Sequence, residues 1–216
     1  MAESDFKARR DALASYVARK VSELQKRANV SSETKRGLAQ LRRAAGTTPG
    51  ATPETWEVEF GGFPEALTGK GTEPSAGEWA AHIALTLYAT HQQSQSLPMH
   101  VPGKEYRLGK AIRLLEFKSQ GVRDGSGQTG PGMPRRFASL LVADDPESLS
   151  HYGRQIVKQL RSCQIPLDYG ELAGDLYGLM SSYHRDDVRM DWCRQFVRPL
   201  SSDSDGSNVD ASADAE

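Results

Sequence analysis

The sequence predicts an all-α fold, a bundle of about seven to nine helices. Three observations lead to this prediction. Apolar residues recur at intervals of three and four along most of the chain, helix-capping residues precede several of these stretches, and no run of alternating β-branched residues indicates a strand. We expect residues 1–200 to form a single helical domain, with the alternative of two helical subregions joined by a connector over residues 47–74.

The first two helices are predicted from amphipathic spacing and from their ends. One extends from about Phe6 to Leu24, with apolar residues on one face and charged residues elsewhere. The next begins at Ser31 and Ser32, because a serine hydroxyl accepts a hydrogen bond from a free amide of the first turn. It ends at Gly46, since glycine readily adopts the backbone conformation that closes a helix.

The connector over residues 47–74 holds four prolines and several glycines. We expect it to contain one short helix or extended piece near Trp56–Phe60. After it, Ser75 and Glu78 have the spacing of a capping box, in which each side chain binds a backbone amide of the other residue. The helix that follows carries an apolar stripe, made of Trp79, Ile83, Leu87 and Tyr88.

The second half of the chain predicts five more helices. One runs from about Tyr106 to Leu115, and residues 119–132, which contain five glycines, form a flexible loop after it. Asp145 before a first-turn proline caps a later helix, and Asp168 repeats the capping-box spacing with Glu171. The last four helices are expected over Arg135–Val142, Pro146–Arg161, Glu171–Ser181 and Val188–Val197.

The net charge of −1 conceals blocks of opposite sign. Residues 1–45 carry 11 Lys and Arg against 5 Asp and Glu, and residues 104–161 carry 11 against 6. Between them, residues 46–103 carry 1 against 6. Residues 201–216 have 0 against 5 and are predicted to be a disordered acidic tail. Two basic blocks favour a polyanionic partner, although solvated helix faces produce the same counts.

Several classes of protein are disfavoured by simple features. Cys163 and Cys193 form no CxxC pair, so neither a disulfide framework nor a cysteine metal site is expected. No apolar run approaches the roughly 20 residues that span a bilayer, and the first residues lack the pattern of a signal peptide. We therefore expect a cytoplasmic protein that has no membrane segment and requires no cofactor.

Catalytic motifs are also not apparent. His82 and His91 are nine positions apart on one predicted helix, so they face opposite sides and cannot share a metal by themselves. The acidic pairs 144–145 and 186–187 flank predicted helix starts, where carboxylates stabilise the first turn. We expect no catalytic residue, no bound metal and no small-molecule substrate. An uncharacterised hydrolase that uses His91 or His184 remains the alternative.

The candidate functional residues are basic. Arg154, Lys158 and Arg161 recur at four and three positions, which places them in one stripe opposite the apolar face of their helix. Backbone phosphates require only reachable cations, so such a stripe suits nucleic-acid binding with little sequence preference. The candidate nucleic-acid-binding residues are Arg42, Arg43, Lys110, Arg113, Arg135, Arg136, Arg154, Lys158 and Arg161.

Six short segments in their order along the chain resemble the CasB family, the small subunit of the type I-E CRISPR surveillance complex called Cascade. The resemblance spans roughly residues 31–198 and leaves out the first 30 residues, the glycine-rich loop and the tail. The segments are Leu38–Arg43, Leu85–Gln92, Leu108–Arg113, Arg135–Leu141, Leu160–Tyr169 and Val188–Val197.

The resemblance implies a non-catalytic helical subunit of a crRNA-containing ribonucleoprotein that acts in antiviral defence. Two copies would lie beside the crRNA-binding backbone subunits and the large subunit. They would stabilise the R-loop by holding the displaced non-target DNA strand, a single strand, while base pairing with crRNA reads the sequence. A scaffold subunit that contacts only protein is the alternative. We also expect the acidic tail to compete weakly with nucleic acid for the basic face.

The resemblance assigns roles to six of the candidate residues through their positions in its segments. These are Arg42 and Arg43, Lys110 and Arg113, and Arg135 and Arg136. The stripe of Arg154, Lys158 and Arg161 comes from helical spacing instead.

Overall fold

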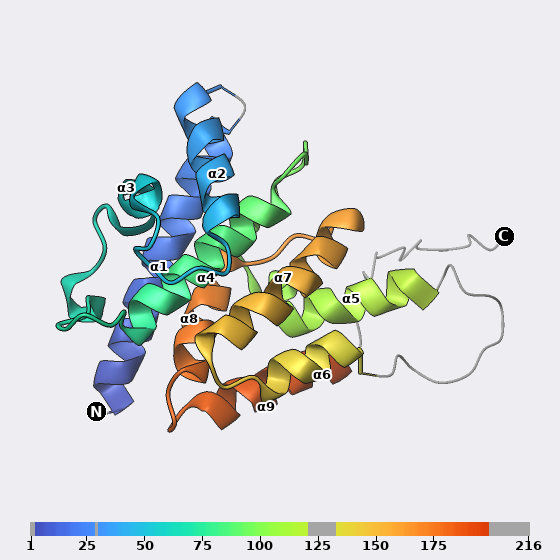
Figure 1. The fold of residues 1–216 in the computed structure, drawn as a ribbon. Coiled ribbons are helices and arrows are strands. Elements are labelled where there is room, and N and C mark those ends of the chain that lie inside the picture. The colour runs from blue at the N-terminus through green and yellow to red at the C-terminus, as the bar shows by residue number, and fades with distance from the viewer. Residues whose placement is uncertain (1–2, 29, 121–132, 199–216) are drawn as a thin grey trace, which may run out of the picture.

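Helix α4 lies at the centre of the molecule, and several of the other helices pack against it (Figure 1). The computed structural model describes residues 3–28, 30–120 and 133–198. In this part of the chain, nine α-helices, three short 3-10 helices and one isolated bridge between His100 and Leu167 confirm the all-α prediction. The elements are α1 (Glu3–Arg27), α2 (Ser32–Ala44), η1 (Pro53–Thr55), α3 (Trp56–Phe60), η2 (Glu65–Leu67), α4 (Ala76–His91), η3 (Lys104–Tyr106), α5 (Leu108–Gln120), α6 (Arg135–Val142), α7 (Pro146–Ser162), α8 (Tyr169–Leu179) and α9 (Arg185–Val197).

The surroundings of α4 differ from the single apolar stripe that the sequence predicts. Every residue from 80 to 91 is buried, because α1, α2, α3, α7 and α8 all contact this helix. Small alanines let the neighbouring helices approach. The polar threonines are satisfied within the helix itself, since Thr86 Oγ1 donates to His82 O at 2.8 Å and Thr90 Oγ1 donates to Thr86 O at 2.9 Å.

The predicted helix caps before α4 and α7 are confirmed. Glu78 N donates to Ser75 Oγ at 3.1 Å and Ser75 N donates to Glu78 Oε2 at 2.7 Å, so both halves of the capping box are present. Ser148 N donates to the carboxylate of Asp145 at 2.7 Å. These bonds satisfy amides that have no partner within the helix and fix where each helix starts.

The capping box predicted at Asp168 is only half formed. Its carboxylate accepts from the amides of Gly170 and Glu171, both at 3.1 Å, so α8 begins directly after it rather than at the predicted Glu171. The Glu171 carboxylate does not return to the cap. It accepts from Arg10 at 3.1 Å and from Arg107 at 2.7 Å, which joins α8 to α1 and to the start of α5.

The first helix belongs to the core, although it lies outside the segments that resemble the CasB family. It packs along α8, and five of its apolar or aromatic side chains are buried. Arg10 Nη2 also contacts Asp175 Oδ1 at 2.9 Å, and Trp192 Nε1 donates to the other oxygen at 2.8 Å. Burial raises the pKa of Asp175, and the hydrogen bonds from Trp192 and Arg10 only partly offset this effect.

The connector over residues 47–74 contains the short helix that was predicted near Trp56–Phe60. It is held to α4 by Glu59, whose Oε2 lies 3.0 Å from His82 Nδ1, with both side chains almost fully buried. Of the flexible loop predicted over residues 119–132, residues 119 and 120 belong instead to helix α5. The rest of that loop and the predicted acidic tail lie outside the described residues. None of the helices within the described ranges is long and apolar enough to cross a membrane.

Candidate nucleic-acid interface

Five of the predicted basic residues come together where the end of α2 meets α7, and we name them the α2–α7 band. Gly46 turns the chain directly after α2, with a φ of +91°. The Arg154 side chain covers this glycine so closely that a β-carbon there would lie 2.5 Å from Nη2. The band consists of Arg42, Arg43, Arg154, Lys158 and Arg161.

The positive charge of the band is not neutralised within the described part of the protein. None of its five side chains forms an ion pair there, although the chain makes such pairs elsewhere. The pKa of Arg42 is lowered, first by burial and then by the charges of Arg43 and Arg161. Neighbouring cations that weaken one another's protonated form favour an anion placed between them.

An open groove of about 700 Å³ runs along this part of α7. Arg154 and Lys158 contribute cations to its wall, and Arg154 Nε is buried without a hydrogen-bond partner among the described residues. A guanidinium can use its free N–H groups to bind two oxygens of one phosphate. The groove, named the α7 groove, is lined by Ala45, Gly46, Glu147, Ser148, His151, Tyr152, Arg154, Gln155 and Lys158.

Two further arginines are positioned by neutral acceptors, which orient their side chains and leave their charge uncompensated. Arg161 Nη1 donates to Thr90 O at 3.2 Å and to Gln93 Oε1 at 2.9 Å. Arg136 Nε donates to Gln155 Oε1 at 3.0 Å, which brings α6 to the edge of the α7 groove. Arg135 is exposed at the start of the same helix.

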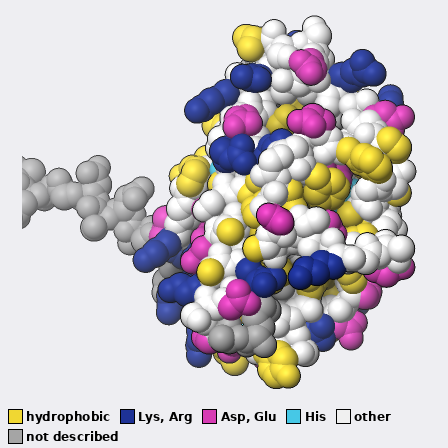
Figure 2. Space-filling view, turned by 90° about the vertical axis from the view of Figure 1, so that its left-hand side faces the viewer, with side chains coloured by type: hydrophobic (Ala, Val, Ile, Leu, Met, Phe, Trp, Pro, Cys, Tyr) yellow, Lys and Arg dark blue, Asp and Glu magenta, His cyan; other side chains and the backbone are white. Residues whose placement is uncertain are grey.

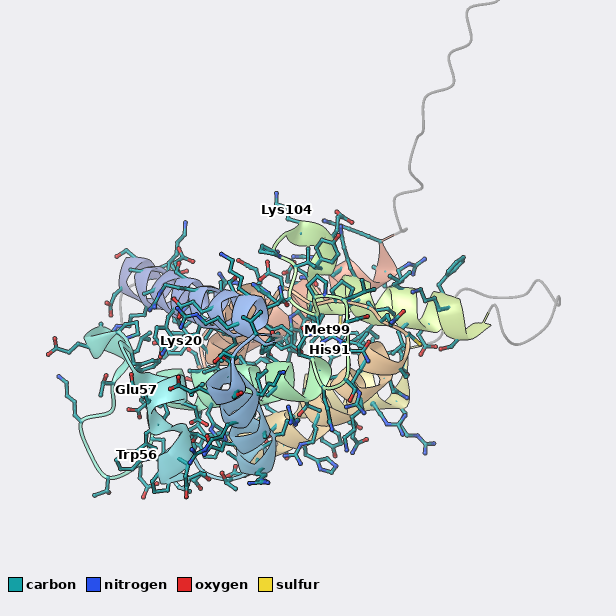
Figure 3. The ribbon with its side chains drawn as sticks, turned by 90° about the horizontal axis from the view of Figure 1, so that it is seen from above. Lys20, Trp56, Glu57, His91, Met99 and Lys104 are labelled. Atoms are coloured by element: carbon teal, nitrogen blue, oxygen red, sulfur yellow. The ribbon has the colours of Figure 1, made fainter. Side chains whose placement is uncertain are left out.

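The predicted pair Lys110 and Arg113 lies apart from the band. Lys110 Nζ contacts Glu105 Oε1 at 2.6 Å, and Arg113 Nη1 donates to Phe196 O at 3.0 Å at the end of α9. Lys104, in the same 3-10 helix as Glu105, lies on the opposite side of the molecule from α2 (Figure 3). Of the four predicted groups of basic residues, the structure therefore brings three to one surface and leaves this pair on another.

Charges of both signs mix on the side of the molecule that is on the left in Figure 1. Figure 2 shows that Lys and Arg side chains are interspersed there with Asp and Glu side chains. On helix α1, Arg9 and Asp5 form an ion pair at 3.2 Å, and Arg19 and Glu23 form one at 3.6 Å. This face has the ordinary character of a solvated surface, in contrast to the α2–α7 band.

Three of the histidines, His82, His91 and His184, pack against other side chains of the fold. His91 is fully buried, its Nδ1 lies 2.9 Å from Tyr169 Oη, and burial together with Arg161 lowers its pKa to about 3. His184 stacks on Phe6 with ring centroids 3.6 Å apart. His82 and His91 contact different elements, as their opposite helix faces predicted. Within residues 3–28, 30–120 and 133–198, no three potential ligands from His, Cys, Asp or Glu gather in a metal site.

A second groove of about 450 Å³ was not predicted from the sequence. It lies between the end of α1, helix α2 and the segment that follows α4, and Arg42 of the band is part of its wall. The feature of the sequence that could have indicated this groove is the polar run Gln92–Ser96, which begins at the last residue of the family-like segment Leu85–Gln92. We name this second groove the amide groove. It is lined by Gln25, Ala28, Lys35, Leu38, Arg42, Gln92, Gln93, Ser94, Gln95, Ser96 and Pro98.

Comparison with known proteins places the chain in a family. No curated protein sequence matches it. Among solved structures, CasB from Thermobifida fusca is similar, with 30% sequence identity, a TM-score of 0.66, and coverage of 86% of this chain and 97% of that chain. A CRISPR-associated protein of the Cse2 family from Thermus thermophilus shares the fold at 21% identity and a TM-score of 0.59, over 85% of this chain and 96% of that chain.

The family comparison covers most of the helical region described above. Residues 37–196 match the model of the CRISPR-associated protein Cse2 family. The matched range includes α7 and the part of α2 from residue 37, and it leaves out α1, which the structure nevertheless places in the core. The chain belongs to the Cse2, or CasB, family of CRISPR-associated proteins, the small subunits of type I-E Cascade.

Proposed function

We propose that this Cascade subunit is non-catalytic and stabilises the R-loop by holding the displaced non-target DNA strand on the α2–α7 band. The observation that supports this most strongly is the gathering of five cations from two helices without an ion pair among the described residues. A single DNA strand is a flexible polyanion, and its phosphates can follow such a surface from one cation to the next.

The chemistry of the band suits phosphates of any sequence. Arginine and lysine reach phosphate oxygens through charge-assisted hydrogen bonds, which carry no information about the bases. This lack of sequence preference agrees with RNA-guided recognition, in which base pairing reads the target sequence and protein cations hold the strands. The resemblance to the CasB family indicates which polyanion binds there, namely the displaced DNA strand.

The proposed partners follow from family membership. They are a second copy of this chain, the crRNA-binding backbone subunits and the large subunit of the complex. We assign them to surfaces outside the α2–α7 band, because a band covered by protein could not hold a DNA strand.

The proposal can be tested by measuring the affinity of the protein for a single-stranded oligonucleotide at several salt concentrations. Replacing Arg154 and Lys158 by alanine removes two cations from the α7 groove. If each meets one phosphate, the log–log salt slope should become shallower by about 1.4, since a neutralised phosphate on a single strand contributes about 0.7.

A charge-matched control uses Lys7→Ala with Lys70→Ala, two exposed lysines on other parts of the surface. This variant should bind with the affinity and slope of the parent. Equal slopes for the parent and the Arg154→Ala, Lys158→Ala variant would contradict the assignment of the band.

A further inference from the structure

The amide groove has a rigid wall made by the segment after α4. Gln92 folds over this segment, donating through Nε2 to Gln95 O at 3.1 Å and to Leu97 O at 3.0 Å. Its Oε1 accepts from the backbone N of Met99, which Figure 3 labels, at 2.9 Å. One side chain thus closes three hydrogen bonds and holds the backbone of the segment in a fixed shape.

The last turn of α1 fixes the other end of the same segment. Gln25 Nε2 donates to His100 O at 3.0 Å, and His100 N donates to Gln25 Oε1 at 3.0 Å. Ser94 adopts a φ of +59°, a left-handed conformation that is uncommon for residues other than glycine. The fixed backbone therefore presents the side chains of residues 93–96 to the groove in a defined arrangement.

The side chains presented to the groove are polar and have free hydrogen-bonding groups. Gln93 uses its Oε1 to accept from Arg161, which leaves its Nε2 available. Among the described residues, the side-chain amide of Gln95 and the hydroxyls of Ser94 and Ser96 form no hydrogen bond. An amide offers two donors and an acceptor, and a hydroxyl offers both kinds of group.

This mixture of donors and acceptors selects among ligands. A phosphate at neutral pH presents only acceptors, so it would leave the acceptors of Gln95 and the serines unused. The edges of nucleobases present donors and acceptors side by side. In a duplex the Watson–Crick edges are already paired, so the groove suits bases of an unpaired strand. Lys35 and Arg42, on the α2 wall, are placed to meet the phosphates of the same strand.

We infer that the amide groove binds unpaired nucleobases of the strand whose phosphates lie on the α2–α7 band. The inference rests on the proposed function, because it extends the path of that strand. Two residues make the two surfaces continuous: Arg42 is shared by the band and the groove, and Arg161 of the band contacts Gln93 at 2.9 Å. Rotatable side-chain amides can serve different bases, so little sequence preference is expected.

The test compares two oligonucleotides of equal length and charge, one of thymidines and one of abasic sugars. The parent protein should bind the thymidine strand about three- to tenfold more tightly, in keeping with one or two net hydrogen bonds. Replacing Gln95 and Ser96 by alanine should remove this preference while the salt slope stays unchanged. The control variant Ser15→Ala with Ser182→Ala, two exposed serines elsewhere, should keep it.

The possible results separate this inference from the proposed function. The inference is overturned if the Gln95→Ala, Ser96→Ala variant keeps the preference, or if the parent protein shows none. It is also overturned if that variant binds both strands like the parent but no longer assembles with the protein subunits, because the groove would then be a protein contact. Failure of the proposed function is distinct, since it appears as an unchanged salt slope when Arg154 and Lys158 are replaced.

Discussion

The guanidinium of Arg154 lies directly over Gly46, and a β-carbon at that glycine would be 2.5 Å from Nη2. This contact brings the turn after α2 against α7 and places Arg154 on the wall of the α7 groove. Glycine is required for two reasons, namely the positive φ of +91° and the absence of a side chain under the arginine. The position of the cation therefore depends on a residue that carries no charge.

Gly46→Ala should weaken nucleic-acid binding by displacing Arg154. Gly50→Ala is the matched control, because Gly50 also has a positive φ, of +79°, but a β-carbon there would lie 3.7 Å from Trp56 Nε1 and near no cation. Both variants should lose about 1 kcal/mol of stability from backbone strain. Only Gly46→Ala should lower the affinity for a single-stranded oligonucleotide, and equal affinities of the two variants would rule out this role.

Asp175→Ala should destabilise the fold strongly. The substitution removes the buried acceptor of the indole N–H of Trp192, while Arg10 keeps its contact with Glu171. A buried donor left without a partner costs about 1–3 kcal/mol. The free energy of unfolding in urea measures the loss. Asp11→Ala, which removes an exposed carboxylate that also contacts Arg10, at 3.4 Å, should change it by less than about 1 kcal/mol. A similar loss of unfolding free energy in both variants would show that the buried carboxylate stabilises the fold no more than the exposed one does.

His91 should make the protein less stable in acid. Its pKa in the folded protein is about 3, below the ordinary value of 6.5, because burial and Arg161 disfavour the imidazolium. The stabilising contribution is complete above pH 6.5 and is lost as the pH falls toward 3, since only the unfolded chain takes up the proton in this window. The slope is up to about 1.4 kcal/mol per pH unit.

Replacing His91 by glutamine removes this proton uptake. The stability of His91→Gln, measured by urea unfolding at several pH values, should fall less steeply between about pH 6.5 and pH 4 than that of the parent. If both proteins show the same dependence on pH, another group is responsible for the acid sensitivity.

The parts of the fold that the sequence predicted correctly depend on local interactions. The caps at Ser75 and Asp145 bind amides only three residues away, so their spacing is visible in the sequence. The contact of Arg10 with Asp175 joins residues 165 positions apart, and nothing local indicates it. For the same reason the sequence left the role of the first helix open, whereas the structure shows that it packs along α8.

The candidate site was likewise predicted correctly only where its residues lie on one helix. Helical spacing predicted that Arg154, Lys158 and Arg161 share a face, but it could not show that Arg42 lies beside that face, because this depends on how α2 packs. Nor could it show that Arg113 donates to the end of α9. The amide groove was missed because three segments that are separate in the sequence build it, and nothing in the sequence shows that they meet.

The most direct test of the central claim is site-specific crosslinking in the assembled Cascade with a bound target. A photoreactive group at Lys158, an exposed position of the α2–α7 band, reports what lies within reach of the α7 groove. The same group at Lys7, an exposed position of α1, is the control. We predict that the label at Lys158 crosslinks to the displaced DNA strand and that the label at Lys7 does not. Crosslinks from Lys158 to protein subunits alone would contradict the claim and support a scaffold role.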